Sequence, residues 1–180
     1  MKRFVSIVLA LVLAFSACAI SASAYDLVPL KFDKNGEFKI MHIADCQDEY
    51  PQDQKMLKFI DAVLKEYQPD IVVLGGDNSV GPRDMTLEHK KQSIEELCNV
   101  FVENEQYFTL VFGNHDREQG HENDELLPMY QLYGKGYCLA YDEVPALHGT
   151  ATHSLPVMSS DGTKIKFNLW MFDSGSHYID

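Results

Sequence analysis

Apolar and polar residues follow two kinds of pattern along this chain, one typical of amphipathic helices and the other of buried strands. Helical spacing of apolar residues predicts helices over residues 53–67 and 87–104. The apolar positions are Met56, Phe59, Ile60, Val63 and Tyr67 in the first helix, and Ile94, Leu97, Cys98, Phe101 and Val102 in the second. The segment Gln68-Pro69-Asp70 predicts the end of the first helix.

Short runs that are apolar at nearly every position predict strands buried on both faces. Such runs occupy residues 71–74 and 107–112. Two further strands are predicted over 27–32 and 37–44, on either side of a turn-forming segment at 33–36. The order strand, helix, strand, helix, strand predicts a parallel sheet with crossover helices.

The rest of the chain is richer in strand signals. Residues 121–133 are polar and predicted to be partly helical, and strands are predicted over 137–141, 150–158 and 164–172. The turn Ser160-Asp161-Gly162 separates the last two strands. The whole pattern predicts an α/β fold.

The first 24 residues have the layout of a secretory signal peptide. Lys2 and Arg3 precede an apolar run that is too short for a comfortable membrane span, and small residues end at Ala24. We therefore expect an exported protein, secreted or periplasmic, with a mature domain over residues 25–180. A less favoured alternative is a lipid anchor on Cys18, because Phe15 is a poor match to a lipoprotein signal. A buried N-terminal helix is less favoured still.

The net charge of the chain limits which classes of partner are expected. Removal of the first 24 residues leaves 13 Lys and Arg against 27 Asp and Glu, a formal net charge of −14. Such a surface repels phosphate backbones, so long nucleic acids are not expected partners. A phosphate-binding site would need its own positive charge, which divalent cations would supply. The three remaining cysteines are an odd number, which argues against a full disulfide framework, and Cys98 is expected in the core.

Three of the predicted strands end in polar clusters. These are Asp45-Cys46-Gln47-Asp48, Gly75-Gly76-Asp77-Asn78 and Gly113-Asn114-His115-Asp116. The carboxyl ends of parallel strands face one crevice, where ligands bind. Carboxylates, amide oxygens and an imidazole suit hard or borderline divalent metals. Each cluster alone is ordinary turn chemistry, but three in order behind buried strands predict a site.

The clusters resemble those of the calcineurin-like metallophosphoesterases, whose pattern is D-x-H, then G-D, then G-N-H-[DE]. The segments FKIMHIADCQD, PDIVVLGGDN, VFGNHDRE and MFDSGS look most like the branch related to purple acid phosphatases and to yeast Dcr2-type phosphatases. The resemblance covers residues 37 to about 177 and implies the N-terminal part of a four-layer αββα sandwich.

The resemblance also implies roles for single residues. Asp45 would bind a first metal ion, Asp77 would bridge two ions and Asn114 would bind the second. His115 would contact the phosphate or protonate the leaving group, and Asp116 would orient His115. The implied activity is hydrolysis of a small phosphorylated substrate, a phosphomonoester, at two divalent cations drawn from Mn, Fe, Zn or Mg.

The chain departs from the family pattern in two places. Gln47 stands where the family has a histidine ligand, and its amide oxygen would bind borderline ions less strongly. A preference for harder ions such as Mn²⁺ or Mg²⁺ is then expected, and a dead site is the less favoured alternative. The chain also has no G-H-x-H motif, and His148, His153 and His177 are candidates by residue type alone. We therefore expect a domain that is incomplete at its C-terminus.

Two other functions stay open at this point. One is a non-catalytic module of the same fold that binds phosphate or metal, suggested by Gln47 and by the missing histidines. The other is a nuclease or nucleotidase of the same superfamily; the acidic surface argues against long nucleic acids, but small nucleotides stay open as substrates. The sequence indicates neither the substrate nor the oligomeric state.

Overall fold

The computed structural model describes residues 30–80, 85–118 and 120–175. The predicted signal peptide, Cys18, the first half of the strand predicted over 27–32, and His177 lie outside these residues. The described part holds five strands and three helices, in the order β1 (Ile40–Ile43), α2 (Gln54–Tyr67), β2 (Ile71–Leu74), α3 (Leu87–Glu103), β3 (Phe108–Leu110), α4 (Asn123–Tyr133), β4 (His153–Met158) and β5 (Ile165–Met171).

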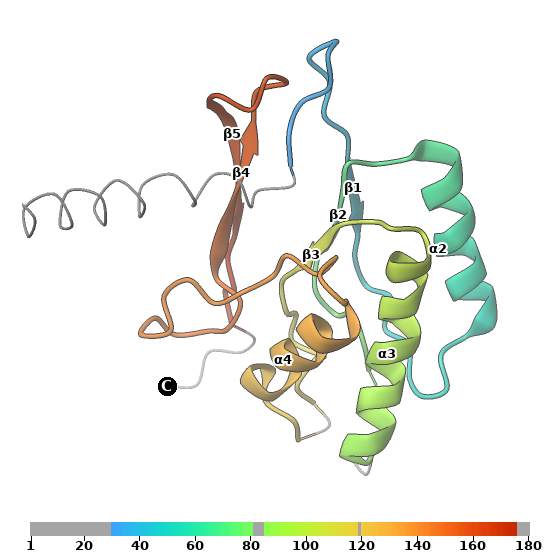
Figure 1. Cartoon of the computed structure of the whole chain (residues 1–180). Coiled ribbons are helices and arrows are strands. Elements are labelled where there is room, and N and C mark those ends of the chain that lie inside the picture. Colours follow the sequence, from blue (N-terminus) through green and yellow to red (C-terminus); the bar gives the residue numbers. More distant parts are fainter. Residues whose placement is uncertain (1–29, 81–84, 119, 176–180) are drawn as a thin grey trace, which may run out of the picture.

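The strands form two sheets. The first is parallel in the order β1-β2-β3, and α2 and α3 are its crossover helices. The second is the antiparallel pair β4-β5. Figure 1 shows the helices on one side of the parallel sheet and the β4-β5 hairpin on the other. This arrangement confirms the predicted α/β class and the largely parallel first sheet, and it has the layering expected of part of an αββα sandwich.

β2 lies between two hydrophobic cores, which explains why it is apolar at every position. Val72 and Leu74 pack with the helices in the larger core. Ile71 and Val73 face the other way and pack with Leu155 and the rest of the hairpin core. All four β2 residues are buried because alternate side chains of a strand point to opposite faces. Packing on both faces therefore holds β2, and the start of the loop that follows it, in a defined position between the two cores.

Several strands are shorter than the sequence predicts. Strand β1 begins at Ile40 rather than at 37, and β3 spans 108–110 rather than 107–112. Lys31 and Cys138 make only isolated parallel bridges, to Met158 and Phe108, where strands were predicted. The turn at 33–36 does form, because the Asp33 carboxylate accepts the backbone N–H groups of Asn35 and Glu37 at 2.8 Å each.

Both crossover helices begin at side-chain caps. The Asp53 side chain accepts the N–H of Lys55 at the start of α2, and Thr86 accepts the N–H of His89 at the start of α3. The buried residues of α3 include Ile94, Leu97, Cys98 and Phe101, as predicted. The fold therefore holds α3, and the loops it contacts, firmly against the sheet.

The predicted buried face of α2 is partly wrong. The buried residues are Leu57, Ile60 and Leu64, whereas Phe59 is 67% exposed and Tyr67 is 62% exposed. Both sets recur at helical spacing, so the periodicity fixes the helix but not its rotation.

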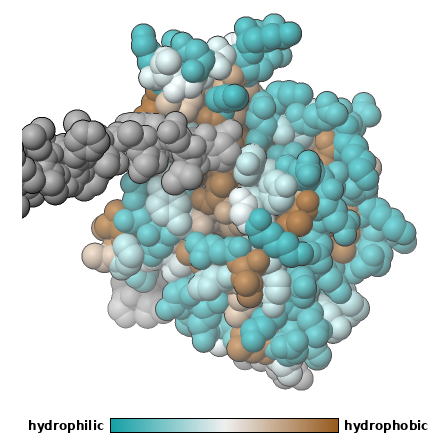
Figure 2. Space-filling view, viewed as in Figure 1, coloured by the Kyte–Doolittle hydropathy of each residue, from teal (hydrophilic) through white to brown (hydrophobic). Residues whose placement is uncertain are grey.

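The visible surface is mainly hydrophilic, with scattered apolar patches (Figure 2). Exposed aromatic residues include the stacked pair Trp170 and Phe172 at the end of the β4-β5 hairpin. Within the described ranges, no helix has both the length and the apolar character needed to cross a bilayer.

Candidate functional site

The loops after β1, β2 and β3 meet at one edge of the parallel sheet. Neighbouring strands end in register, with Ile43 opposite Leu74 and Leu74 opposite Leu110. Backbone hydrogen bonds continue past the first two strands, from the N–H of Asp45 to the carbonyl of Gly76 at 3.1 Å and from the N–H of Gln47 to the carbonyl of Asp77 at 3.0 Å.

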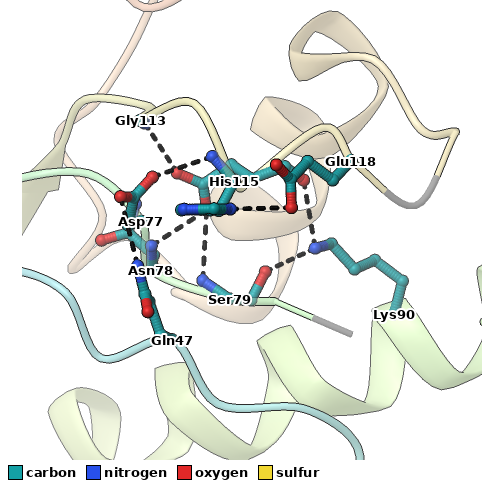
Figure 3. Close-up of polar contacts among 9 residues, drawn as sticks. Gln47, Asp77, Asn78, Ser79, Lys90, Gly113, His115 and Glu118 are labelled. Atoms are coloured by element: carbon teal, nitrogen blue, oxygen red, sulfur yellow. Dashed lines mark hydrogen bonds and ion pairs between the residues drawn. The ribbon is translucent and has the colours of Figure 1, made fainter. Parts of the chain in front are cut away.

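Asp77 joins the three loops. Its Oδ1 accepts the backbone N–H of His115 at 2.9 Å, and its Oδ2 lies 3.4 Å from Nε2 of Gln47. Besides Asp77, the predicted site residues on these touching loops are Asp45, Gln47, Asn114 and His115. Figure 3 shows Asp77 next to Gln47 and His115, with Gln47 below it and His115 beside it.

The backbone at this edge is held in an unfavourable conformation. Asp45, Gln47 and Asp77 have φ angles of 57°, 43° and 50°, in the left-handed region that non-glycine residues rarely adopt. Such conformations persist where the surrounding structure fixes them, and they are common at functional sites. All three are predicted metal ligands, so the strain coincides with the candidate site.

Gly76 and Gly113 are required for this close approach. A Cβ atom on Gly113 would lie 2.1 Å from Oδ1 of Asp77 and 2.4 Å from its backbone nitrogen. A Cβ on Gly76 would lie 2.9 Å from the nitrogen of Gly113. Only glycine therefore allows the loops after β2 and β3 to pack with the Asp77 carboxylate between them.

Asp116 contacts backbone amides behind the predicted site. It is completely buried, and its carboxylate accepts the backbone N–H groups of Gly113 at 2.7 Å, Asn78 at 3.0 Å and Ser79 at 3.2 Å. Burial raises its pKa to about 6, although these three donors and Lys90 act in the opposite direction. Asp116 thus ties the loop after β2 to the loop after β3.

The carboxylate of Glu118 contacts the imidazole ring of His115. Its Oε2 lies 2.7 Å from Nδ1 of His115, and the two side chains are 45% and 35% exposed. The hydrogen bond to Glu118 is the main reason that the pKa of His115 is raised, and nearby Asp77 and Asp116 add to it. A carboxylate on Nδ1 fixes the orientation of the ring, as is usual for functional histidines.

Neither Glu118 nor Lys90 is predicted from the sequence pattern. Lys90 is a fully buried lysine of α3 whose Nζ contacts Ser79 and the backbone of Asp116. A weak signal for it exists, because Lys90 lies three to four residues before Ser93 and Ile94 on the buried face of the helix. Glu118 has no comparable signal beyond its place three residues after His115.

The other candidate histidines differ in their surroundings. His153 is buried, with Nε2 at 2.7 Å from Oγ1 of Thr109 and Nδ1 at 2.7 Å from the carbonyl of Ala151, so it links the two sheets. His148 lines an open cavity of about 420 Å³, and Gly113 and Arg117 are also among its lining residues. Both ring nitrogens of His153 are thus engaged by Thr109 and Ala151.

The residues at the sheet edge fit part of a dinuclear metal centre. Oxygen atoms are available from two carboxylates, Asp45 and Asp77, and from two amides, Gln47 and Asn114, a set suited to hard divalent cations. Within the described ranges, no three His, Cys, Asp or Glu side chains cluster closely enough to hold a metal ion.

Comparison with known families decides what kind of fold this is. The sequence pattern of the calcineurin-like phosphoesterases matches residues 38–173, which include every strand and helix described above. The chain belongs to this family. Calcineurin-like phosphoesterases generally use two divalent metal ions and act on small phosphorylated substrates. The resemblance predicted from the three strand-end clusters is thereby confirmed.

Individual relatives support the same branch. "Probable inactive purple acid phosphatase 28" of Arabidopsis thaliana is 25% identical over 84% of this chain and 45% of its own length. "Probable inactive purple acid phosphatase 14" from the same plant is 24% identical over 92% of this chain and 46% of its own length. "Phosphatase DCR2" of Saccharomyces cerevisiae is 30% identical over 46% of this chain and 17% of its own length. The chain thus spans about half the length of the plant relatives it matches.

Proposed function

We propose that the protein is a metal-dependent phosphomonoesterase, with its site at the carboxyl edge of the β1-β2-β3 sheet. Family membership supports a phosphoesterase. The observation that carries the proposal is the position of Asp77, whose two carboxylate oxygens contact the loops after β1 and β3. A residue at that junction is well placed to bridge two cations.

The proposed roles follow the donor chemistry of each side chain. Asp45 and Gln47 would bind one cation and Asn114 a second, with Asp77 shared between them. Bound cations of this kind polarise a phosphate group and lower the pKa of bound water, which provides a nucleophile. They would also offset the formal net charge of −14 on residues 25–180, which otherwise repels an anionic substrate.

His115 would protonate the leaving oxygen. Its Nδ1 faces Glu118, so we assign proton donation to Nε2 on the opposite side of the ring. The raised pKa of His115 favours the protonated form that an acid needs. Positioned general acids of this type contribute about 10²- to 10⁴-fold to the rate.

The test is hydrolysis of p-nitrophenyl phosphate by the full-length protein, with and without added Mn²⁺. We expect cation-dependent turnover that falls by at least about 10²-fold in Asp77→Asn, which keeps the shape of the side chain but removes its charge. Asp61→Asn is a matched control, since Asp61 lies on α2 and pairs with Lys65. Undiminished hydrolysis in Asp77→Asn would show that the activity does not depend on Asp77, and it would refute the proposed site.

A second candidate function is a non-catalytic module of the same fold that binds phosphate or metal. Gln47 in place of a histidine favours it, as does the word "inactive" in the names of three plant relatives. This alternative predicts that the full-length protein binds Mn²⁺ or inorganic phosphate with no turnover of any phosphomonoester. Equilibrium binding beside the hydrolysis assay separates the two functions.

We also propose that the protein is exported by cleavage after Ala24. The layout of the first 24 residues supports this, and lipid attachment at Cys18 is the alternative. N-terminal sequencing of the mature protein distinguishes them, because cleavage after Ala24 exposes Tyr25 whereas lipidation begins the chain at Cys18.

A further inference from the structure

A buried positive charge lies directly behind the candidate site. Lys90 is completely buried near the start of α3, and it is among the largest fully buried side chains of the described residues. Burying an ammonium group costs several kcal/mol unless it is well paired. The desolvation is visible in the pKa of Lys90, which burial lowers to about 8 while the charge of Asp116 opposes the shift. A lysine retained at such a place calls for an explanation beyond packing.

Lys90 contacts two of the three loops that form the site. Its Nζ donates to Oγ of Ser79 at 2.5 Å, two residues after Asp77. The same Nζ donates to the backbone carbonyl of Asp116 at 3.1 Å, immediately after His115. Figure 3 shows the Lys90 side chain reaching from its helix toward Ser79, with Asp77 and His115 beyond it.

Asp116 completes the hydrogen-bond network that includes Lys90 and Ser79. Its carboxylate accepts the N–H groups of Ser79 and Gly113, while its carbonyl accepts from Lys90. Helix α3, the loop after β2 and the loop after β3 are thus tied together by charge-assisted hydrogen bonds, which are stronger than neutral ones. Because Asp77 has a φ angle of 50°, an unfavourable value, it needs such support to keep its position.

We infer that Lys90 is a positioning residue, whose buried ammonium group holds the loops carrying Asp77 and Asn114-His115 at the separation that cation binding requires. The inference rests on the proposed metal site, but it does not require that the site be catalytic. Lys90 is too deeply buried to contact a substrate, so it acts through Ser79 and Asp116. Groups that act in this way on metal ligands typically change metal affinity by about 10- to 100-fold.

The experiment compares Mn²⁺ affinity, measured by electron paramagnetic resonance, in the full-length protein and in the variant Lys90→Met. Methionine keeps most of the volume and removes the charge. We expect affinity to fall by about 10- to 100-fold in Lys90→Met. Lys91→Met, the adjacent lysine of α3, is the matched control and should bind Mn²⁺ as the unsubstituted protein does. Circular dichroism melting curves establish that each variant is folded at the temperature of the measurement.

A folded Lys90→Met variant with Mn²⁺ affinity within about twofold of the unsubstituted protein would overturn the inference, since a purely structural lysine predicts that result. If Lys90→Met does not fold, Ser79→Ala removes one contact and leaves the charge in place. It should weaken Mn²⁺ binding about threefold or more, and unchanged binding would overturn the inference. Mn²⁺ binding without phosphomonoester hydrolysis would refute the proposed enzyme but not the role of Lys90. Absence of Mn²⁺ binding by the unsubstituted protein would refute both.

Discussion

Oδ1 of Asp77 accepts a hydrogen bond from the backbone N–H of His115, with 2.9 Å between the two heavy atoms. The contact joins a residue on the loop after β2 to a residue on the loop after β3, 38 positions further along the chain. It exists only because Gly113 has no side chain at the point where the two loops meet. The geometry of the candidate site therefore depends on a glycine that carries no chemistry of its own.

Substitution of Gly113 by alanine should damage the site more than the fold. The new Cβ would meet Oδ1 of Asp77 at 2.1 Å, so the carboxylate has to move. We expect Mn²⁺ affinity to fall by at least about tenfold, or about 1.4 kcal/mol of binding free energy. Isothermal titration of the full-length variant measures this.

The matched control for this experiment is Gly162→Ala in the β4-β5 turn. Gly162 has a φ angle of 72° and open space around its Cα, so alanine costs about 1 kcal/mol of folding free energy through backbone strain. Mn²⁺ affinity should be unchanged in this variant. Equal loss of affinity in both variants would mean that general destabilisation, and not the Asp77 contact, explains the result for Gly113.

A histidine at position 47 should strengthen metal binding. Gln47 lies next to Asp77, and its left-handed backbone is one that histidine tolerates better than most residues. Because imidazole is a stronger ligand than an amide for borderline ions, Gln47→His should tighten Zn²⁺ binding by about tenfold, roughly 1.4 kcal/mol. Competition with a chromogenic chelator measures the affinity. If Gln47→His and Gln47→Ala both bind Zn²⁺ as the unsubstituted protein does, residue 47 is not a ligand.

Substitution of two carboxylates near His115 should change the folding free energy to very different extents. Asp116→Asn places an amide NH₂ group in a pocket lined by three N–H donors, so we expect a loss of about 3 kcal/mol or more of folding free energy. Glu118 is 45% exposed, and Glu118→Gln should change stability by less than about 0.5 kcal/mol. Urea denaturation measures both values. A stable Asp116→Asn variant would show that the buried carboxylate does not hold the two loops together.

The sequence allowed the site to be located because the rule behind the prediction is simple. Buried apolar runs separated by crossover helices imply a parallel sheet, and the ends of its strands converge. Asp45, Gln47 and Asp77 are therefore predicted at one edge of the sheet without any knowledge of side-chain contacts. The structure adds what no local pattern contains, namely the pairing of His115 with Glu118 and of Asp116 with backbone amides. These pairings depend on which loops touch, and residues distant in the sequence decide that.

Stability should depend on pH through His153. Burial lowers the pKa of His153 from 6.5, while Ala151, Glu143 and Asp142 act to raise it, and the Tyr141 ring packs 5.0 Å away. As the pH falls below 6.5, His153 is therefore protonated more readily in the unfolded chain than in the folded protein. The contribution of His153 to stability is complete above pH 6.5 and is lost as the pH falls below it, by at most about 1.4 kcal/mol per pH unit.

The measurement compares urea denaturation of the unsubstituted protein and of His153→Gln between pH 7.5 and pH 5.5. The difference between the two proteins isolates His153, because Asp116, with its raised pKa of about 6, has the opposite pH dependence in both. We expect the unsubstituted protein to lose more stability than His153→Gln on acidification. Parallel pH profiles would mean that the Thr109–His153 contact adapts to the protonated ring.

The rotation of α2 provides a test of core packing that is independent of the site. Ile60 is 2% exposed and Phe59 is 67% exposed, although helical periodicity alone assigns both to the apolar face. Ile60→Ala leaves a cavity in the core between α2, α3 and the sheet, and should cost about 2–5 kcal/mol of folding free energy. Phe59→Ala removes a larger side chain but should cost less than about 0.5 kcal/mol, because that side chain is mostly in water. Chemical denaturation of both variants measures the difference. A larger loss for Phe59→Ala would mean that its ring is covered in the full-length protein and that the outer face of α2 is an internal surface.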